Sequence, residues 1–195
     1  MERRQREGST RASELLQATA AAMALPAVAS LWEDLVSSLG RALGVDWAFV
    51  GESLLGKNNV IQTLAAWHRG KIVPNFEYTF ERSAEDDVLS QDVCLYTCEV
   101  QKHLSNPWLQ QENAQAFGRV SLPGPLGGVR GLLAIAHSQP LEDADMIEAV
   151  LRIFGFRAGM ELERWRADEH FYRKLLEIAQ ESPPSYTKFI RSSTA

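Results

Sequence analysis

Hydrophobic residues recur along the chain with two different periods, which predict a mixture of helices and strands. Over residues 26–43 apolar side chains recur every three or four positions, which is the spacing of one face of a helix. Pro26 is tolerated in a first helical turn, and Gly44 is a typical stop signal. The chain therefore opens its ordered part with an amphipathic helix, whose apolar positions are Val28, Leu31, Leu35, Leu39 and Leu43.

Short β-prone runs follow, separated by turn-forming residues. They predict strands at 47–50, 60–70, 93–96, 117–122 and 129–137, with hairpin turns at 53–59 and 123–128. Residues 71–78 are predicted to be extended chain. Phe76, Tyr78 and Phe80 alternate along it and would face one side. Ser83 and Asp86 resemble a capping box and predict a short helix through Leu89. Residues 98–116 are weakly helical, with an interruption at 105–107.

A long helix is predicted after Pro140, with acidic residues in its first turn. A second apolar row on this helix has a spacing of seven, at Met146, Ile153 and Met160. Such a helix either packs on the sheet with one face and on a partner helix with the other, or buries one wide face. The helical pattern continues beyond residue 167 and stops at Pro183.

The order of these elements predicts an α+β domain, because hairpins dominate and no βαβ unit is evident. We expect an antiparallel sheet with terminal helices packed on one face and a loop-rich opposite face. The chain of 195 residues suits one core. We divide it into a flexible arm at 1–25, the domain at 26–166, and a helical connector and tail at 167–195.

Charge and cysteine content narrow the function classes. The formal net charge of −5 gives no basic field for nucleic acid. Two cysteines do not make a disulfide framework, so we expect a reducing, cytoplasmic location. The apolar run at 18–30 follows basic residues as in a signal peptide, but it is alanine-rich, broken by proline and too short to span a bilayer. An N-terminal arm and no membrane span are the favoured interpretation.

Four segments together resemble a GAF domain, the small sensor module of many signalling proteins. They are 43-LGVDWAFVGE-52, 74-PNFEYTFERSAEDDVLSQDVCLY-96, 117-FGRVSLPGPLGGVRGLLAIAH-137 and 140-PLEDADMIEAVLRIFGFRAGMELER-164. The second is similar to GAF domains of bacterial sensor kinases and diguanylate cyclases. One departure is Arg119, which stands where the family usually has a small residue.

The resemblance implies a regulatory module with a loop-walled pocket for a small molecule. It also implies a homodimer formed through the terminal helices, a downstream kinase or cyclase domain, and no catalysis by this domain. The identity of a ligand or cofactor stays open. Two alternatives also stay open: a ligand-free dimerisation module that uses Met146, Ile153 and Met160, and a thiol redox sensor that uses Cys94 and Cys98.

The pocket hypothesis rests on side chains that can enclose a small molecule. On a short strand, Cys94 and Tyr96 point the same way. Aromatic rings supply apolar walls, and tyrosine adds a polar tip. The same residues could simply fill the core, and both interpretations stand at this point. The candidate pocket residues are Trp67, Phe76, Tyr78, Cys94, Tyr96 and Phe117.

Other chemistry finds less support in the sequence. Cys94, Cys98 and His103 supply three metal ligands at most, whereas structural zinc needs four, so we expect no metal. Bilin-carrying GAF domains usually place a histidine directly after the attachment cysteine. Here Leu95 and Glu99 follow the two cysteines, so we expect no bilin.

Overall fold

The computed structural model describes residues 31–54, 60–79, 93–124 and 129–181, with side chains up to residue 167. Several predicted features lie outside these residues. They are the arm at 1–25, the start of the first helix at 26–30, most of both hairpin turns, Phe80, the helix expected through Leu89, and the tail. The chain divides into two compact units, Met1–Gly159 and Met160–Ala195. In the described part of the second unit the backbone is helical up to Glu181.

The first unit is built on a seven-stranded antiparallel sheet. Its strands follow the order β3-β2-β1-β7-β6-β5, and β4 pairs with β2 beside β3. The hairpins β1–β2 and β6–β7 meet where β1 pairs with β7, which confirms the predicted antiparallel α+β architecture. The strands are β1 (Trp47–Ser53), β2 (Val60–His68), β3 (Lys71–Val73), β4 (Glu77–Thr79), β5 (Val93–Tyr96), β6 (Ala116–Pro123) and β7 (Val129–His137).

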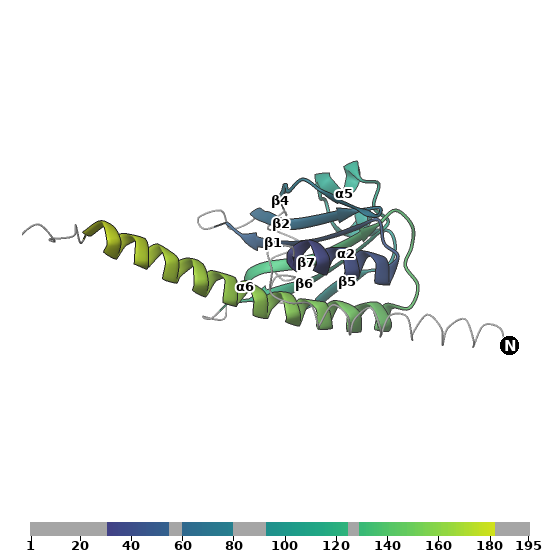
Figure 1. Ribbon diagram of the computed structural model, residues 1–195. Coiled ribbons are helices and arrows are strands. Elements are labelled where there is room, and N and C mark those ends of the chain that lie inside the picture. Colours follow the sequence, from purple (N-terminus) through teal and green to yellow (C-terminus); the bar gives the residue numbers. More distant parts are fainter. Residues whose placement is uncertain (1–30, 55–59, 80–92, 125–128, 182–195) are drawn as a thin grey trace, which may run out of the picture. The chain divides into compact units, whose positions relative to one another are not determined.

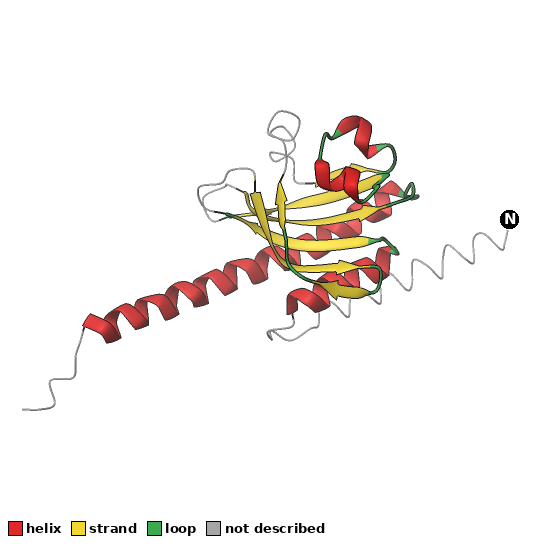
Figure 2. Ribbon diagram, turned by 90° about the horizontal axis from the view of Figure 1, so that it is seen from above, coloured by secondary structure: helices red, strands yellow, loops and turns green. Residues whose placement is uncertain are grey.

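Helices cover the two faces of this sheet unequally. Helix α2 (Leu31–Leu43) and the beginning of α6 (Ala144–Glu181) lie on one face, which we name the helix face (Figure 1). The short helices α4 (Val100–His103) and α5 (Pro107–Gln111) lie on the opposite loop face (Figure 2). The weak helical pattern over 98–116 therefore corresponds to two short helices with irregular chain around them.

Close packing on the helix face depends on two small residues. A Cβ at Gly40 of α2 would lie 2.3 Å from Cε3 of Trp67, and one at Gly155 of α6 would lie 2.5 Å from Cγ1 of Val120. Only glycine allows the helices to approach the strands this closely. Leu35 and Leu39 complete the buried face of α2, as the helical spacing predicted, and Val36 is buried with them.

The turn between β2 and β3 differs from the expected extended chain. Arg69 and Gly70 both have positive φ, 44° and 94°, so β3 folds back on the end of β2. Arg69 tolerates this backbone because its amide donates to the Asp46 carbonyl at 2.8 Å, and its Nε donates to Oδ1 of Asp46 at 2.9 Å. This fold-back was not predicted, since arginine is not a usual residue at positive φ.

Candidate ligand-binding site on the loop face

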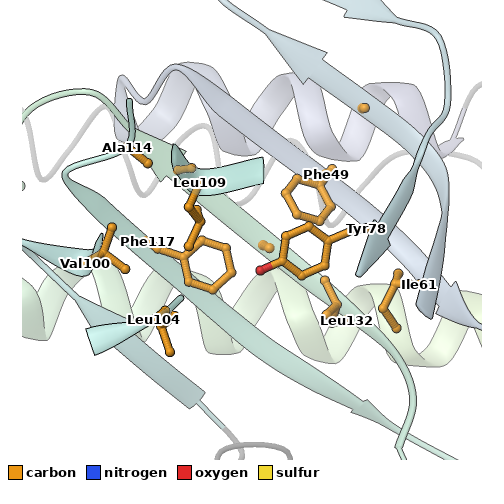
Figure 3. Packing of buried hydrophobic residues seen from close by; sticks show 12 residues of the cluster. Phe49, Ile61, Tyr78, Val100, Leu104, Leu109, Ala114, Phe117 and Leu132 are labelled. Carbon is orange, nitrogen blue, oxygen red and sulfur yellow. The ribbon is translucent and has the colours of Figure 1, made fainter. Parts of the chain in front are cut away.

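The loop face of the sheet is lined by alternate residues of the central strands. Phe49 of β1, Phe117 of β6 and Leu132 of β7 point to this face. Successive side chains of a strand point to opposite faces, so their neighbours Val50 and Leu133 point to the helices. Figure 3 shows Phe49, Tyr78 and Phe117 gathered with Leu104 and Leu109 in one cluster. These side chains form the floor of the candidate site.

Aromatic rings from four separate segments meet on this floor. Phe76 stacks on Trp108 with ring centroids 5.6 Å apart and an angle of 13°. Tyr78 stacks on Phe117 at 6.2 Å and contacts Phe49 at 5.4 Å. Such offset and edge contacts add to the stability given by burial. The predicted pocket residues Phe76, Tyr78 and Phe117 therefore lie together, although Trp108 of α5 was not among them.

Asn106 connects this aromatic cluster to helix α5. Its Oδ1 accepts from the amides of Trp108 and Leu109 at 3.0 and 3.3 Å, which caps the helix. Its Nδ2 donates to the hydroxyl of Tyr78 at 3.0 Å and to the carbonyl of Thr79 at 2.9 Å. Asn106 is fully buried, so the side chain holds α5 against β4. The sequence signal was the 105-SNP-107 tripeptide, an N-cap residue followed by proline.

Strand β5 adds the cysteine and tyrosine of the predicted pocket. Cys94 and Tyr96 alternate with Leu95, which lies on the helix face near Gly118. Tyr96 packs on the aromatic cluster and stacks on His103, with ring centroids 5.3 Å apart. Cys94 is buried, Cys98 is exposed, and the two are not joined by a disulfide.

A buried guanidinium lies on the same face. Arg119 of β6 stands opposite Cys94 in the sheet and is 3% exposed. Its Nη1 donates to Oγ of Ser121 at 3.0 Å, which fixes the plane of the group. An arginine this deeply buried presents a fixed positive charge and several N–H donors. The sequence had marked Arg119 as a departure from the family pattern, but not as a site residue.

Trp67 does not join the other predicted pocket residues. It pairs with Ala48 in β1 and lies on the helix face, where its ring packs against Gly40. The physical reason is strand alternation, which sends Ala66 to the loop face and its neighbour Trp67 to the helices. The structure therefore brings together Phe76, Tyr78, Tyr96 and Phe117 directly, and places Cys94 beside them on β5.

A second polar cluster lies at the end of the sheet, around Asp46. The Asp46 carboxylate accepts from Arg69 Nε, and its Oδ2 accepts from the amide and hydroxyl of Ser138 at 2.8 and 2.6 Å. His137 Nδ1 lies 3.1 Å from the same oxygen, an ion-pair distance. Burial by itself would raise the pKa of Asp46, but the bonds from Arg69 and Ser138 and the charge of His137 hold it well below its ordinary value.

Helix α6 leaves apolar side chains at the surface. Ile153 is 39% and Phe156 66% exposed, and Met146 is half-buried. Met160, the first residue of the second unit, is 54% exposed. Met146, Ile153 and Phe156 share one helical stripe of the first unit that we name the α6 seam, and Phe156 was absent from the sequence prediction.

Within the described residues no three histidine, cysteine or acidic side chains are placed to hold a metal ion. No helix among them is long and apolar enough to cross a membrane.

No protein-family model matches the chain, and no curated protein matches it in sequence. Solved structures do match. The chromophore-binding domain of a bacteriophytochrome from Stigmatella aurantiaca has a TM-score of 0.60 at 12% identity, covering 79% of this chain and 60% of that one. The same domain of an unusual bacteriophytochrome from R. palustris has a TM-score of 0.62 at 10% identity, covering 83% and 63%.

This likeness confirms the expected fold. Chromophore-binding domains of bacteriophytochromes contain a GAF domain, and the sheet with its helices has a GAF-like fold. The chain spans about three fifths of the length of these two domains.

Proposed function

We propose that the chain is a sensory, signal-relaying module that binds a small molecule on the loop face and has no catalytic activity. The observation that carries this proposal is the aromatic floor with the buried guanidinium of Arg119 on a GAF-like sheet. An apolar wall with a few placed polar groups is the usual composition of a small-molecule site. Bacteriophytochrome domains of the same fold bind a chromophore, which supports a sensory role.

A thermal-shift screen tests the proposal. Cyclic nucleotides, haem, flavin, biliverdin and small aromatic acids are the compounds, and the full chain is the target. We expect at least one compound to raise the melting temperature, and Arg119→Met to remove that effect. Arg41→Met is the matched control, because Arg41 is exposed on helix α2. The proposal fails if no compound stabilises the chain, or if both variants respond like the parent.

Signal relay requires an output, and the α6 seam supports dimerisation as that output. Large apolar side chains at a spacing of three and four residues pack well against an identical helix. We infer a cytoplasmic homodimer in which α6 passes the signal to a downstream kinase or cyclase domain. A ligand-free dimerisation module is the second candidate function, and the exposure of Phe156 is the observation that favours it.

The redox alternative is a prediction that thiol counting would test. Cys94 is buried and Cys98 is exposed, and a switch would require these two free thiols to reach disulfide geometry.

A further inference from the structure

Arg119 is a charged residue on a largely apolar part of the loop face. It stands on β6 two residues beyond Phe117, about 7 Å further along the strand and on the same face. Its neighbours across the sheet are Cys94 of β5 and Ala134 of β7, both buried and both small. The guanidinium is buried with them, so water screens its charge poorly.

The orientation of the guanidinium is fixed. Nη1 of Arg119 donates to Oγ of Ser121 at 3.0 Å, and Ser121 lies on the same strand. A guanidinium is planar and presents its N–H donors in a fork that matches the two oxygens of a carboxylate. Because the plane of the fork is held, the direction from which such an acid approaches is held as well.

Asn106 is another buried polar residue of the loop face, but its hydrogen-bonding positions are all used within the protein. Its Oδ1 accepts from two amides of α5, and its Nδ2 donates to the Tyr78 hydroxyl and the Thr79 carbonyl. A primary amide has two acceptor and two donor positions, so these four bonds account for all of them. The polar contact that selects a ligand is therefore assigned to Arg119 rather than to Asn106.

An apolar surface adjoins Arg119 on the same face. Phe117 and Tyr78 stack with ring centroids 6.2 Å apart, and Figure 3 shows both in one cluster with Leu132. Leu132 pairs with Ser121 across the sheet, so this surface reaches the strand position that holds the guanidinium. A flat ring on these side chains has its acidic substituent directed toward β6.

We propose that the ligand of the loop-face site is an aromatic carboxylate, whose acid bonds the Arg119 guanidinium and whose ring contacts Phe117 and Tyr78. A buried cation selects an anion because their attraction is strong where the dielectric constant is low. A neutral ligand lacks this attraction, and a cationic ligand is repelled. This inference rests on the proposed loop-face function and names its class of ligand. Since Arg119 stands where GAF domains usually have a small residue, the selectivity belongs to this chain rather than to the fold.

Cinnamate and cinnamamide are the probes, because they share a planar shape and differ in charge. Each is titrated into the full chain in a calorimeter. We expect cinnamate to bind at least about tenfold more tightly than cinnamamide, since a hydrogen bond to a charged group is roughly twice as strong as a neutral one. Cinnamylammonium, which reverses the charge, should bind more weakly than either. An amide that binds as tightly as the acid would overturn the proposal.

Arg119→Gln and Arg41→Gln are a matched pair of variants. Each removes one guanidinium, the first from the loop face and the second from the exposed side of α2. We expect Arg119→Gln to bind the acid and the amide with about equal affinity, and Arg41→Gln to keep the preference of the parent. Melting temperatures show whether each variant folds, and the two probes on the parent chain decide the case if Arg119→Gln does not. A folded Arg119→Gln that still prefers the acid would also contradict the proposal.

The outcomes separate this inference from the proposed function. If both probes fail to bind while another compound of the thermal-shift screen stabilises the chain, the ligand site stands and the class of ligand is wrong. If no compound of any class binds, the proposed function and this inference fail together.

Discussion

Asn106 joins two segments of the loop face through four hydrogen bonds. A buried side chain with all of its polar groups satisfied stabilises strongly, because removing it leaves several partners without a bond. We expect Asn106→Ala to lower the free energy of unfolding by about 2–4 kcal/mol, the sum of a lost helix cap and orphaned buried groups. Urea denaturation followed by tryptophan fluorescence measures this.

The control for that experiment is Gln110→Ala on the exposed side of α5. Its effect should stay within about 0.5 kcal/mol, as for surface substitutions in general. Similar losses in the two variants would show that Asn106 has no special role in holding the loop face.

The low pKa of Asp46 predicts how the stability of the fold depends on pH. Its pKa in the folded chain lies below the ordinary value of 3.8, so the bonds of the ionised carboxylate stabilise the fold above that pH. This stability is lost as the pH falls from about 4 through the lower, folded-state pKa. Asp46→Asn should cost about 1–2 kcal/mol at pH 7, since partial exposure weakens the ion pairs. It should also flatten the acid dependence.

Urea unfolding of both proteins at pH 7, 5, 4 and 3 is the measurement. If the parent and Asp46→Asn lost stability in parallel below pH 4, the pKa of Asp46 would not be the cause.

Residue faces could be predicted only where the sequence alternates. Phe76 and Tyr78 are separated by the polar Glu77, so the pattern assigned both to one face, and the structure places both in the loop-face cluster. Trp67 ends the apolar run 64-LAAW-67, in which both faces look alike. Such a run gives no information about direction, and only the pairing with β1 settles which way Trp67 points.

At the scale of elements, the close approach of α2 to β2 can be tested with Gly40→Ala. In this variant, higher helix propensity and overpacking against Trp67 have opposite effects on stability. Alanine favours helix over glycine by about 1 kcal/mol, so propensity alone predicts that Gly40→Ala stabilises. A Cβ there would lie 2.3 Å from the Trp67 ring, and overpacking costs about 1–3 kcal/mol. We expect a net loss of stability in thermal unfolding. Ser37→Ala on the same helix, away from this contact, should be neutral or stabilising.

The order of strands and helices was accessible from the sequence because each hydrophobic period is local. The strands around both hairpins and the long helix after Pro140 lie close to their predicted ranges. The fold-back into β3 was missed, since its positive φ angles depend on Asp46, which is distant in sequence from Arg69. Asn106 gains its role in the same way, because Tyr78 and Thr79 lie 28 and 27 residues before it in the sequence.

The α6 seam predicts how the helix associates. Burying a phenylalanine contributes about 1.5–3 kcal/mol, and a symmetric dimer buries two. Phe156→Glu should therefore raise the dimer dissociation constant at least tenfold, as measured by light scattering over a dilution series. Ile72→Glu is the control, because Ile72 is also exposed, at 40%, but lies on β3. A parent chain that is monomeric at high concentration would contradict the dimer.

At the scale of the whole molecule, the sheet connects the loop face to α6. Arg119 and Phe117 of β6 face the candidate site, while Val120 between Arg119 and Ser121 packs against Gly155 of α6. A ligand that moves β6 thus has a direct mechanical contact with the helix. Whether that contact transmits a signal depends on two arrangements of the helix that bind the ligand unequally.

The coupling between ligand binding and dimerisation can be measured, because it must be the same in both directions. If a compound from the thermal-shift screen shifts the dimer dissociation constant, dimerisation must shift the affinity for that compound by the same factor. Allosteric coupling is typically about 1–3 kcal/mol, so we expect a factor of roughly 5–150 in both experiments. Titrating the compound into the parent and into Phe156→Glu gives one factor, and sedimentation with and without the compound gives the other. Equal affinity for monomer and dimer would separate ligand binding from dimerisation and leave α6 without a role in relay.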